Sequence, residues 1–116
     1  MSGRTIADLK LDDRVRAALE AARAELTARF DVDRIVLFGS VARGEADEES
    51  DVDLLVVLKH PPDRHVRNEI SRLMFSINLE HDTNLSGLVV DRDAWEQGMV
   101  SVMPIHNEVE REGILL

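Results

Sequence analysis

Cysteine and tyrosine are absent from this sequence of 116 residues, and its aromatic side chains are three phenylalanines and one tryptophan. Without cysteine there is neither a disulfide framework nor a thiolate metal site, which fits the reducing cytosol. So few aromatic rings give little support for stacking on exposed bases. The chain also has no excess of basic residues, because its net charge is −9. We therefore expect no direct binding of nucleic acid, whose phosphates attract a basic surface.

Long apolar runs are also missing. No segment approaches the roughly 20 apolar residues of a membrane span, and the beginning, MSGRTIADLK, has no apolar stretch of the signal-peptide kind. We therefore expect no membrane association and a cytoplasmic location. The length predicts one domain over residues 1–116, large enough to bury a core. The acidity is explained most simply by solubility, and otherwise by a basic protein partner.

Apolar residues at helical spacing predict two long helices. The first begins near residue 13, where Asp12 and Asp13 can cap it, and the second begins after Asp63. The apolar stripes are Val15, Leu19, Ala22, Leu26 and Phe30 in the first helix, and Val66, Ile70, Leu73, Met74 and Ile77 in the second.

Short apolar segments at 35–38, 52–58 and 85–90 predict three strands. The remaining predicted elements are a short helix from Ser40, an acidic loop at 46–50, a helical turn at 93–97 carrying Trp95 as a core or interface anchor, and a last helix between Pro104 and Gly113. The apolar ending ILL is expected to dock on the domain. This order predicts a small α/β (α+β) domain whose helices pack on a mixed sheet.

The candidate chemistry lies in "RIVLFGSVARGEADEESDVDLLVVL", residues 34–58. Side chains alternate between the faces of a strand, so Asp51 and Asp53 share one face. Two neighbouring carboxylates repel one another, which is unfavourable in a purely structural strand. A divalent cation removes the repulsion, and Mg²⁺ is commonly held by one or two carboxylates together with substrate phosphates. The pair therefore predicts a magnesium site where a hydrophobic strand begins.

The Gly39-Ser40 turn provides a complementary place for phosphates. Gly39 has no side chain, so its backbone and a phosphate can approach closely. Free N–H groups at the start of a helix favour an anion, the Ser40 hydroxyl can donate a hydrogen bond, and Arg43 could neutralise further charge. Each feature alone has an ordinary structural explanation as a turn or a surface residue. Together, on two adjacent apolar strands, they indicate phosphoryl or nucleotidyl transfer.

The stretch "GSVARGEADEESDVDLLV" resembles the signature of the minimal nucleotidyltransferases, the small single-domain branch of the DNA polymerase beta-like superfamily. That signature is Gly-Ser, ten residues, then Asp-x-Asp, and here it runs from Gly39-Ser40 to Asp51 and Asp53, with Ala-Arg-Gly following the Gly-Ser. The resemblance implies the nucleotidyltransferase-like fold. It also implies binding of a nucleoside triphosphate, by preference ATP, with two Mg²⁺ ions at one end of the sheet.

In that family Ser40 would hold the β- or γ-phosphate and the two aspartates would hold the metals. An acceptor hydroxyl would attack the α-phosphate and release pyrophosphate. Family members usually carry a third carboxylate on a following strand. We align that position with Asn84, which can coordinate a metal through its carbonyl oxygen but brings no charge and cannot act as a base. Asp82 would share a face with Asn84 on an extended strand and could substitute for it.

The resemblance also implies a partner, because such minimal proteins are often paired with a helical HEPN-domain ribonuclease toxin and act as its antitoxin. We therefore expect transfer of AMP to a partner protein. The alternative is an antitoxin or interaction module that acts by contact, with weak or absent catalysis, and Asn84 favours it. A third hypothesis is transfer to a cationic small molecule such as an aminoglycoside, for which no second domain is evident. A homodimer through a sheet edge or the apolar ILL stays open.

Overall fold

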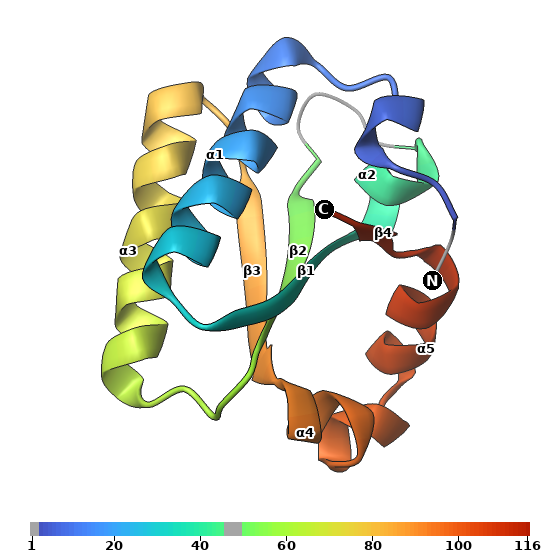
Figure 1. Ribbon diagram of the computed structural model, residues 1–116. Helices are drawn as coiled ribbons and strands as arrows, with labels where there is room; N and C mark the ends of the chain where they lie inside the picture. The colour runs from blue at the N-terminus through green and yellow to red at the C-terminus, as the bar shows by residue number, and fades with distance from the viewer. Residues whose placement is uncertain (1–2, 46–49) are drawn as a thin grey trace.

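The computed structural model describes residues 3–45 and 50–116, so most of the predicted acidic loop lies outside the described residues (Figure 1). Within them the strands are β1 (Val32–Phe38), β2 (Val52–Leu58), β3 (Leu85–Asp91) and β4 (Ile114–Leu115). They form one sheet in the order β3-β2-β1-β4. The strand β1 is antiparallel to β2 and to β4, whereas β2 and β3 are parallel. The predicted mixed sheet is therefore confirmed.

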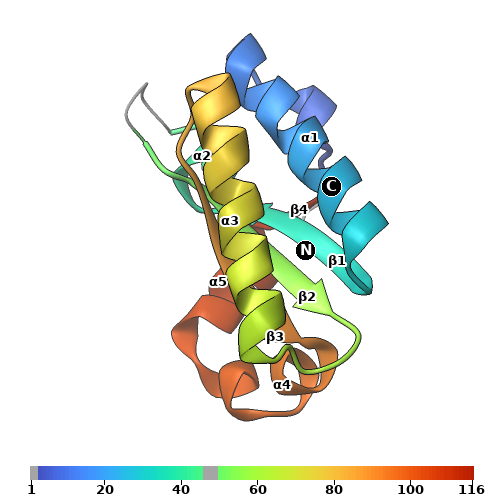
Figure 2. The same ribbon diagram turned by 90° about the vertical axis from the view of Figure 1, so that its left-hand side faces the viewer.

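Helices cover both faces of this sheet. They are η1 (Ile6–Asp8), α1 (Asp13–Arg29), α2 (Gly39–Arg43), α3 (Arg64–His81), α4 (Arg92–Glu96), η2 (Met99–Val102) and α5 (Pro104–Glu112). The long helices α1 and α3 lie side by side on one face, and α4, η2 and α5 gather on the other (Figures 1 and 2). In the part of the chain that the structure describes, no helix is both long and apolar enough to cross a membrane.

The alternation of side chains along the strands divides the core into two clusters. Ile35 and Leu37 of β1 face α1 and α3, whereas Val36 and Phe38 face the other layer. Trp95, only 1% exposed, anchors the second cluster, as predicted. Each strand of the sheet centre therefore buries both of its faces, which is why β1 and β2 read as nearly continuous apolar runs.

The two long helices begin where their caps are. The Asp12 side chain accepts a hydrogen bond from the Arg14 N–H, and the Asp63 side chain accepts one from the Val66 N–H, both at 2.8 Å. The middle of each predicted apolar stripe is buried. The buried residues are Ala18, Leu19, Ala22 and Leu26 in α1 and Ile70, Leu73, Met74 and Ile77 in α3.

Two boundaries differ from the sequence predictions. The strand β1 begins at Val32 instead of residue 35, because Val32 and Arg34 pair with Leu58 and Val57 across an irregularity in the ladder. The apolar ending docks as predicted, but it does so as the strand β4, where Ile114 pairs with Leu37. Both differences arise from hydrogen bonding to a distant strand, which local sequence does not encode.

Candidate active site

The two carboxylates of the Asp-x-Asp pair lie at the N-terminal end of β2. Asp53 is the second residue of the strand, and Asp51 immediately precedes it and is exposed. Val52 and Leu54 pack toward α1 and α3, so the alternation of the strand directs Asp53 to the opposite face, which it shares with Leu55. This packing agrees with the expected alternation, in which Asp53 lies on the face of β2 opposite Val52 and Leu54.

Asp53 occupies an electrostatically unfavourable position. Partial burial raises the pKa of its carboxyl, the negative charges of Asp51 and Glu108 raise it further, and the positive charge of Arg43 opposes them. An ionised Asp53 is therefore destabilised in the protein alone. A divalent cation would reverse the effect, because it would interact favourably with both aspartates.

Gly39 lies against Asp53 at the junction of β1 and α2. Its φ is +79°, a backbone conformation that side chains with a Cβ rarely adopt. A Cβ placed on Gly39 would overlap Asp53 Oδ2 and would lie 3.3 Å from Asp53 Cγ. The group that approaches this glycine closely in the structure is the carboxylate of Asp53. The approach of a phosphate expected from the sequence is a different contact and stays a prediction.

Arg43 is the cation whose positive charge acts on the carboxyl of Asp53. It ends the five-residue helix α2, which begins with Gly39 and Ser40. Its guanidinium lies 3.0 Å from Glu112, 3.1 Å from Glu45 and 3.4 Å from Glu108. The hydrogen bonds with Glu112 and Glu45 raise the pKa of Arg43, so its positive charge is retained at any ordinary pH.

The glutamates of α5 are the site residues that sequence reasoning missed. Glu108 and Glu112 lie four residues apart on α5 and are therefore on one side of that helix, facing Arg43 of α2. The i, i+4 spacing in "NEVERE" was a usable signal for a shared face. Arg43 and Glu108 are separated by 65 positions in the sequence, so the local pattern gave no indication of what that face would contact.

The structure shows which residues of β3 lie beside the Asp-x-Asp segment. Asp53 of β2 pairs with Ser86 of β3 in the parallel ladder, and Ser86 is exposed on the same face. Asn84 precedes the strand, and its carbonyl accepts the Val52 N–H at 2.9 Å. Ser86, and not Asn84, is therefore the residue beside Asp53. Across the described ranges 3–45 and 50–116, no three His, Asp or Glu side chains come together as a metal site.

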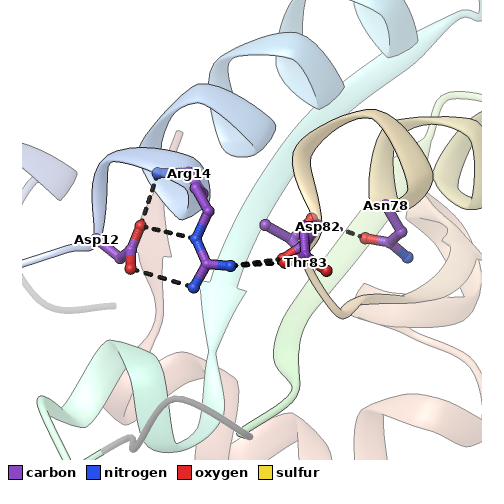
Figure 3. Close-up of polar contacts among 5 residues, drawn as sticks. All are labelled: Asp12, Arg14, Asn78, Asp82 and Thr83. Carbon is purple, nitrogen blue, oxygen red and sulfur yellow. Dashed lines mark hydrogen bonds and ion pairs between the residues drawn. The ribbon is translucent and has the colours of Figure 1, made fainter.

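Asp82 does not extend β3, so the expectation that it shares a strand face with Asn84 is wrong. It ends α3 in the left-handed conformation, with φ 54° and ψ 54°. Its carboxylate lies 2.8 Å from Arg14 Nη1, and Asp12 lies on the other side of the same guanidinium (Figure 3). The reason is local: a residue that closes a helix turns the chain back before the strand begins.

A cavity of about 580 Å³ has Ser50 and Val52 in its lining, so it lies next to the Asp-x-Asp segment. It is lined by the segment around η1, the first turn of α1, Val41 and Val52, and residues 82–84. The five residues predicted for the site, Gly39, Ser40, Arg43, Asp51 and Asp53, do not line it. Gly44 and Ser50, which do line it, are the chain neighbours of Arg43 and Asp51, so the cavity adjoins the candidate active site.

Comparison with known proteins finds matches to nucleotidyltransferases and protein adenylyltransferases. Residues 19–102 match the family model described as the nucleotidyltransferase domain. The protein adenylyltransferase MntA of Thermococcus cleftensis is 46% identical over 50 residues, which cover 43% of this chain and 50% of that protein. The chain spans about half the length of the curated relatives it matches, whose aligned shares range from 43% to 64%.

Solved structures share the fold. One assigned to the minimal nucleotidyltransferases superposes with a TM-score of 0.61 at 26% identity, and the match covers both chains in full. A chain from a crystal structure of a toxin–antitoxin with AMP-PNP gives a TM-score of 0.54 at 18% identity, covering 89% of this chain and 69% of that one.

Proposed function

We propose that this chain, which belongs to the nucleotidyltransferase family, binds ATP with Mg²⁺ and transfers AMP to a hydroxyl group of a partner protein. The observation that supports the proposal is that Asp53 lies against Gly39 and that the pKa of its carboxyl is raised by partial burial and by the negative charge of Asp51. Among the residues that the structure describes, Arg43 is the cation whose charge opposes the raised pKa of Asp53, and its guanidinium is already paired with three glutamates.

The residues fit a hard divalent cation. Asp51 is exposed and Asp53 is half-buried, and both offer carboxylate oxygens, the donor type that Mg²⁺ with bound phosphates requires. When bound, Mg²⁺ would neutralise the triphosphate and make the α-phosphorus more susceptible to attack. The acceptor oxygen would then bond to the α-phosphorus, the bond to the bridging oxygen of the β-phosphate would break, pyrophosphate would leave, and the acceptor proton would pass to solvent.

Gly39, Ser40 and Arg43 are the proposed phosphate contacts. Ser40 stands in the first turn of α2, next to the glycine that touches Asp53. Arg43 is held at the same end of the sheet by Glu108 and Glu112, and its side chain is about one-third exposed. A triphosphate would compete with these glutamates for the guanidinium, so binding would exchange one set of ion pairs for another.

A second candidate function is neutralisation of the partner by contact, with nucleotide binding but little transfer. The observation that favours it is Ser86, which stands beside Asp53 in the register where a further carboxylate would complete the metal site. A hydroxyl is a weaker metal ligand than a carboxylate and adds no negative charge.

The partner we propose is a HEPN-type toxin. A similar chain belongs to a toxin–antitoxin crystal structure, and the net charge of −9 favours a partner with a basic surface. ATP is proposed as the nucleotide because a relative is named a protein adenylyltransferase and AMP-PNP is present with the similar toxin–antitoxin.

The test uses ATP labelled at the α-phosphate, Mg²⁺ and a HEPN-domain protein encoded in the same operon. Label on the partner that disappears with EDTA and with the Asp51→Ala/Asp53→Ala variant supports transfer. If that variant protects cells from the partner as well as the unmodified protein does, and no label appears, contact is the mechanism. Absence of Mg²⁺-dependent ATP binding by calorimetry would refute both forms of the proposal.

A further inference from the structure

Asn78, in the last turn of α3, forms the contacts that a neighbouring strand would make with β3. Its Oδ1 accepts a hydrogen bond from the Leu85 N–H at 2.7 Å, and its Nδ2 donates one to the Leu85 carbonyl at 3.0 Å. A single side-chain amide therefore satisfies both backbone groups of the first residue of β3. Because β3 is the edge strand of the sheet, these groups would otherwise lack a strand partner.

The same amide also holds the turn between α3 and β3. The Thr83 hydroxyl donates to Asn78 Oδ1 at 3.1 Å, and the Thr83 N–H donates to the Asn78 carbonyl at 3.1 Å. Figure 3 shows Asp82 and Thr83 together at this turn, with Arg14 on one side of them and Asn78 on the other. The Asn78 contacts are partly buried, whereas the Arg14 and Asp82 side chains are exposed, so the amide is the stronger of the two restraints.

This turn is bonded directly to the strand that carries the aspartates. The Asn84 carbonyl accepts the N–H of Val52, the residue between Asp51 and Asp53, at 2.9 Å. In the ladder that follows, Leu85 pairs with Val52 and Ser86 pairs with Asp53. A shift of β3 by one residue would reverse its faces and move Ser86 away from Asp53.

We infer that Asn78 is a positioning residue for the candidate active site, which fixes where β3 begins and so holds the Asp-x-Asp segment in place. This inference rests on the proposed function for its consequence in binding. Its structural part, the coupling of Asn78 to the Val52 N–H, stands on the hydrogen bonds alone.

The fold supplies a matched control for this residue. Arg67, also on α3, donates from Nη1 to the Val89 carbonyl at 3.2 Å, so it too caps the outer edge of β3. Val89 pairs with Val56, far along β2 from the aspartates. Asn78 and Arg67 therefore make the same kind of contact from the same helix, at the near and the far end of the strand.

The test compares Asn78→Ala and Arg67→Ala by amide hydrogen exchange and by calorimetry with ATP and Mg²⁺. We expect the Val52 amide to exchange about tenfold faster in Asn78→Ala and to be unchanged in Arg67→Ala, since only the first loses a contact at that end. The dissociation constant for ATP with Mg²⁺ should rise roughly tenfold in Asn78→Ala and less than about twofold in Arg67→Ala.

Equal effects of the two substitutions at Val52 would overturn the inference. If Asn78→Ala does not fold, Asn78→Asp replaces it, because it keeps an acceptor for the Leu85 N–H and loses only the donor. The exchange rate of the Val52 amide in Asn78→Asp is then compared with that in Arg67→Ala, and equal rates would overturn the inference. Should the unmodified protein fail to bind ATP with Mg²⁺, the proposed function is refuted, while the exchange rates at Val52 still accept or reject the role of Asn78.

Discussion

Substitution of Gly39 by alanine is expected to displace the Asp53 carboxylate. The added Cβ would overlap Asp53 Oδ2 and crowd its Cγ and Cβ, which lie 3.3 and 3.4 Å away. The backbone at Gly39 also has φ +79°, so alanine is strained there whatever the space. Gly44, at the end of α2, separates these two effects, because its φ is +73° but nothing lies within 4 Å of an added Cβ.

The expected losses of stability and of affinity for ATP with Mg²⁺ differ between Gly39→Ala and Gly44→Ala. A left-handed conformation costs a residue with a Cβ roughly 1–2 kcal/mol, and we expect both variants to lose about this much stability. Crowding of a packed site adds on the order of 1 kcal/mol for Gly39→Ala alone, unless Asp53 rotates away. If it rotates, the cost appears as a lower affinity for Mg²⁺ with ATP, on the order of tenfold or more.

Urea unfolding and calorimetry with ATP and Mg²⁺ measure these two quantities. We expect Gly44→Ala to lose stability and bind normally, and Gly39→Ala to lose both stability and affinity. The reasoning is refuted if Gly39→Ala and Gly44→Ala bind ATP with Mg²⁺ with the same affinity, because the contact with Asp53 is the feature that distinguishes the two positions. It is also refuted if Gly44→Ala is the one that loses affinity.

Three further substitutions test the electrostatics of the site. The folded protein raises the pKa of Asp53 above its ordinary 3.8. At neutral pH the ionised carboxylate therefore lowers the free energy of unfolding. This destabilisation disappears as the pH falls toward 3.8, where the carboxyl is protonated in the folded protein. Asp53→Asn should therefore melt at a higher temperature than the unmodified protein at pH 7 without Mg²⁺, with the difference vanishing near pH 4; a lower melting temperature at pH 7 would contradict this. Arg43→Met should change stability little, because its ion pairs with Glu108 and Glu112 are partly solvent-exposed, yet it should weaken ATP binding in calorimetry, and unchanged affinity would exclude Arg43 as a phosphate contact. Ser86→Asp should strengthen Mg²⁺ binding and increase label transfer from ATP, since it places a carboxylate beside Asp53; no gain in either would mean that the register does not define the metal site.

Much of the site could be predicted because its parts are local in sequence. The pairing of a glycine turn with Asp51 and Asp53 depends on strand alternation and on the backbone freedom of Gly39, both of which are properties of a few neighbouring residues. The contact between Gly39 and Asp53 then follows from an antiparallel hairpin of β1 and β2, in which Phe38 pairs with Asp53.

The third carboxylate could not be placed in this way. The sequence pattern favours Asn84 for that position, and the ladder shows in addition that Ser86 is the residue of β3 beside Asp53. The difference of two residues depends on where α3 ends, and Asp82 ends it in a left-handed conformation that a strand pattern cannot indicate. Asn78 then bonds to Leu85 and sets the start of β3.

The sequence by itself determined the helices, their caps, the buried stripes and the face on which the aspartates lie, because these follow from periods of two and 3.6 residues and from side chains that bond to their own backbone. Tertiary structure alone decided that Glu108 and Glu112 hold Arg43 and that the chain ends as a strand on β1. It also decided that Ser86 stands beside Asp53. Each of these depends on the register between segments far apart in the chain, and that register is selected by packing of the whole domain.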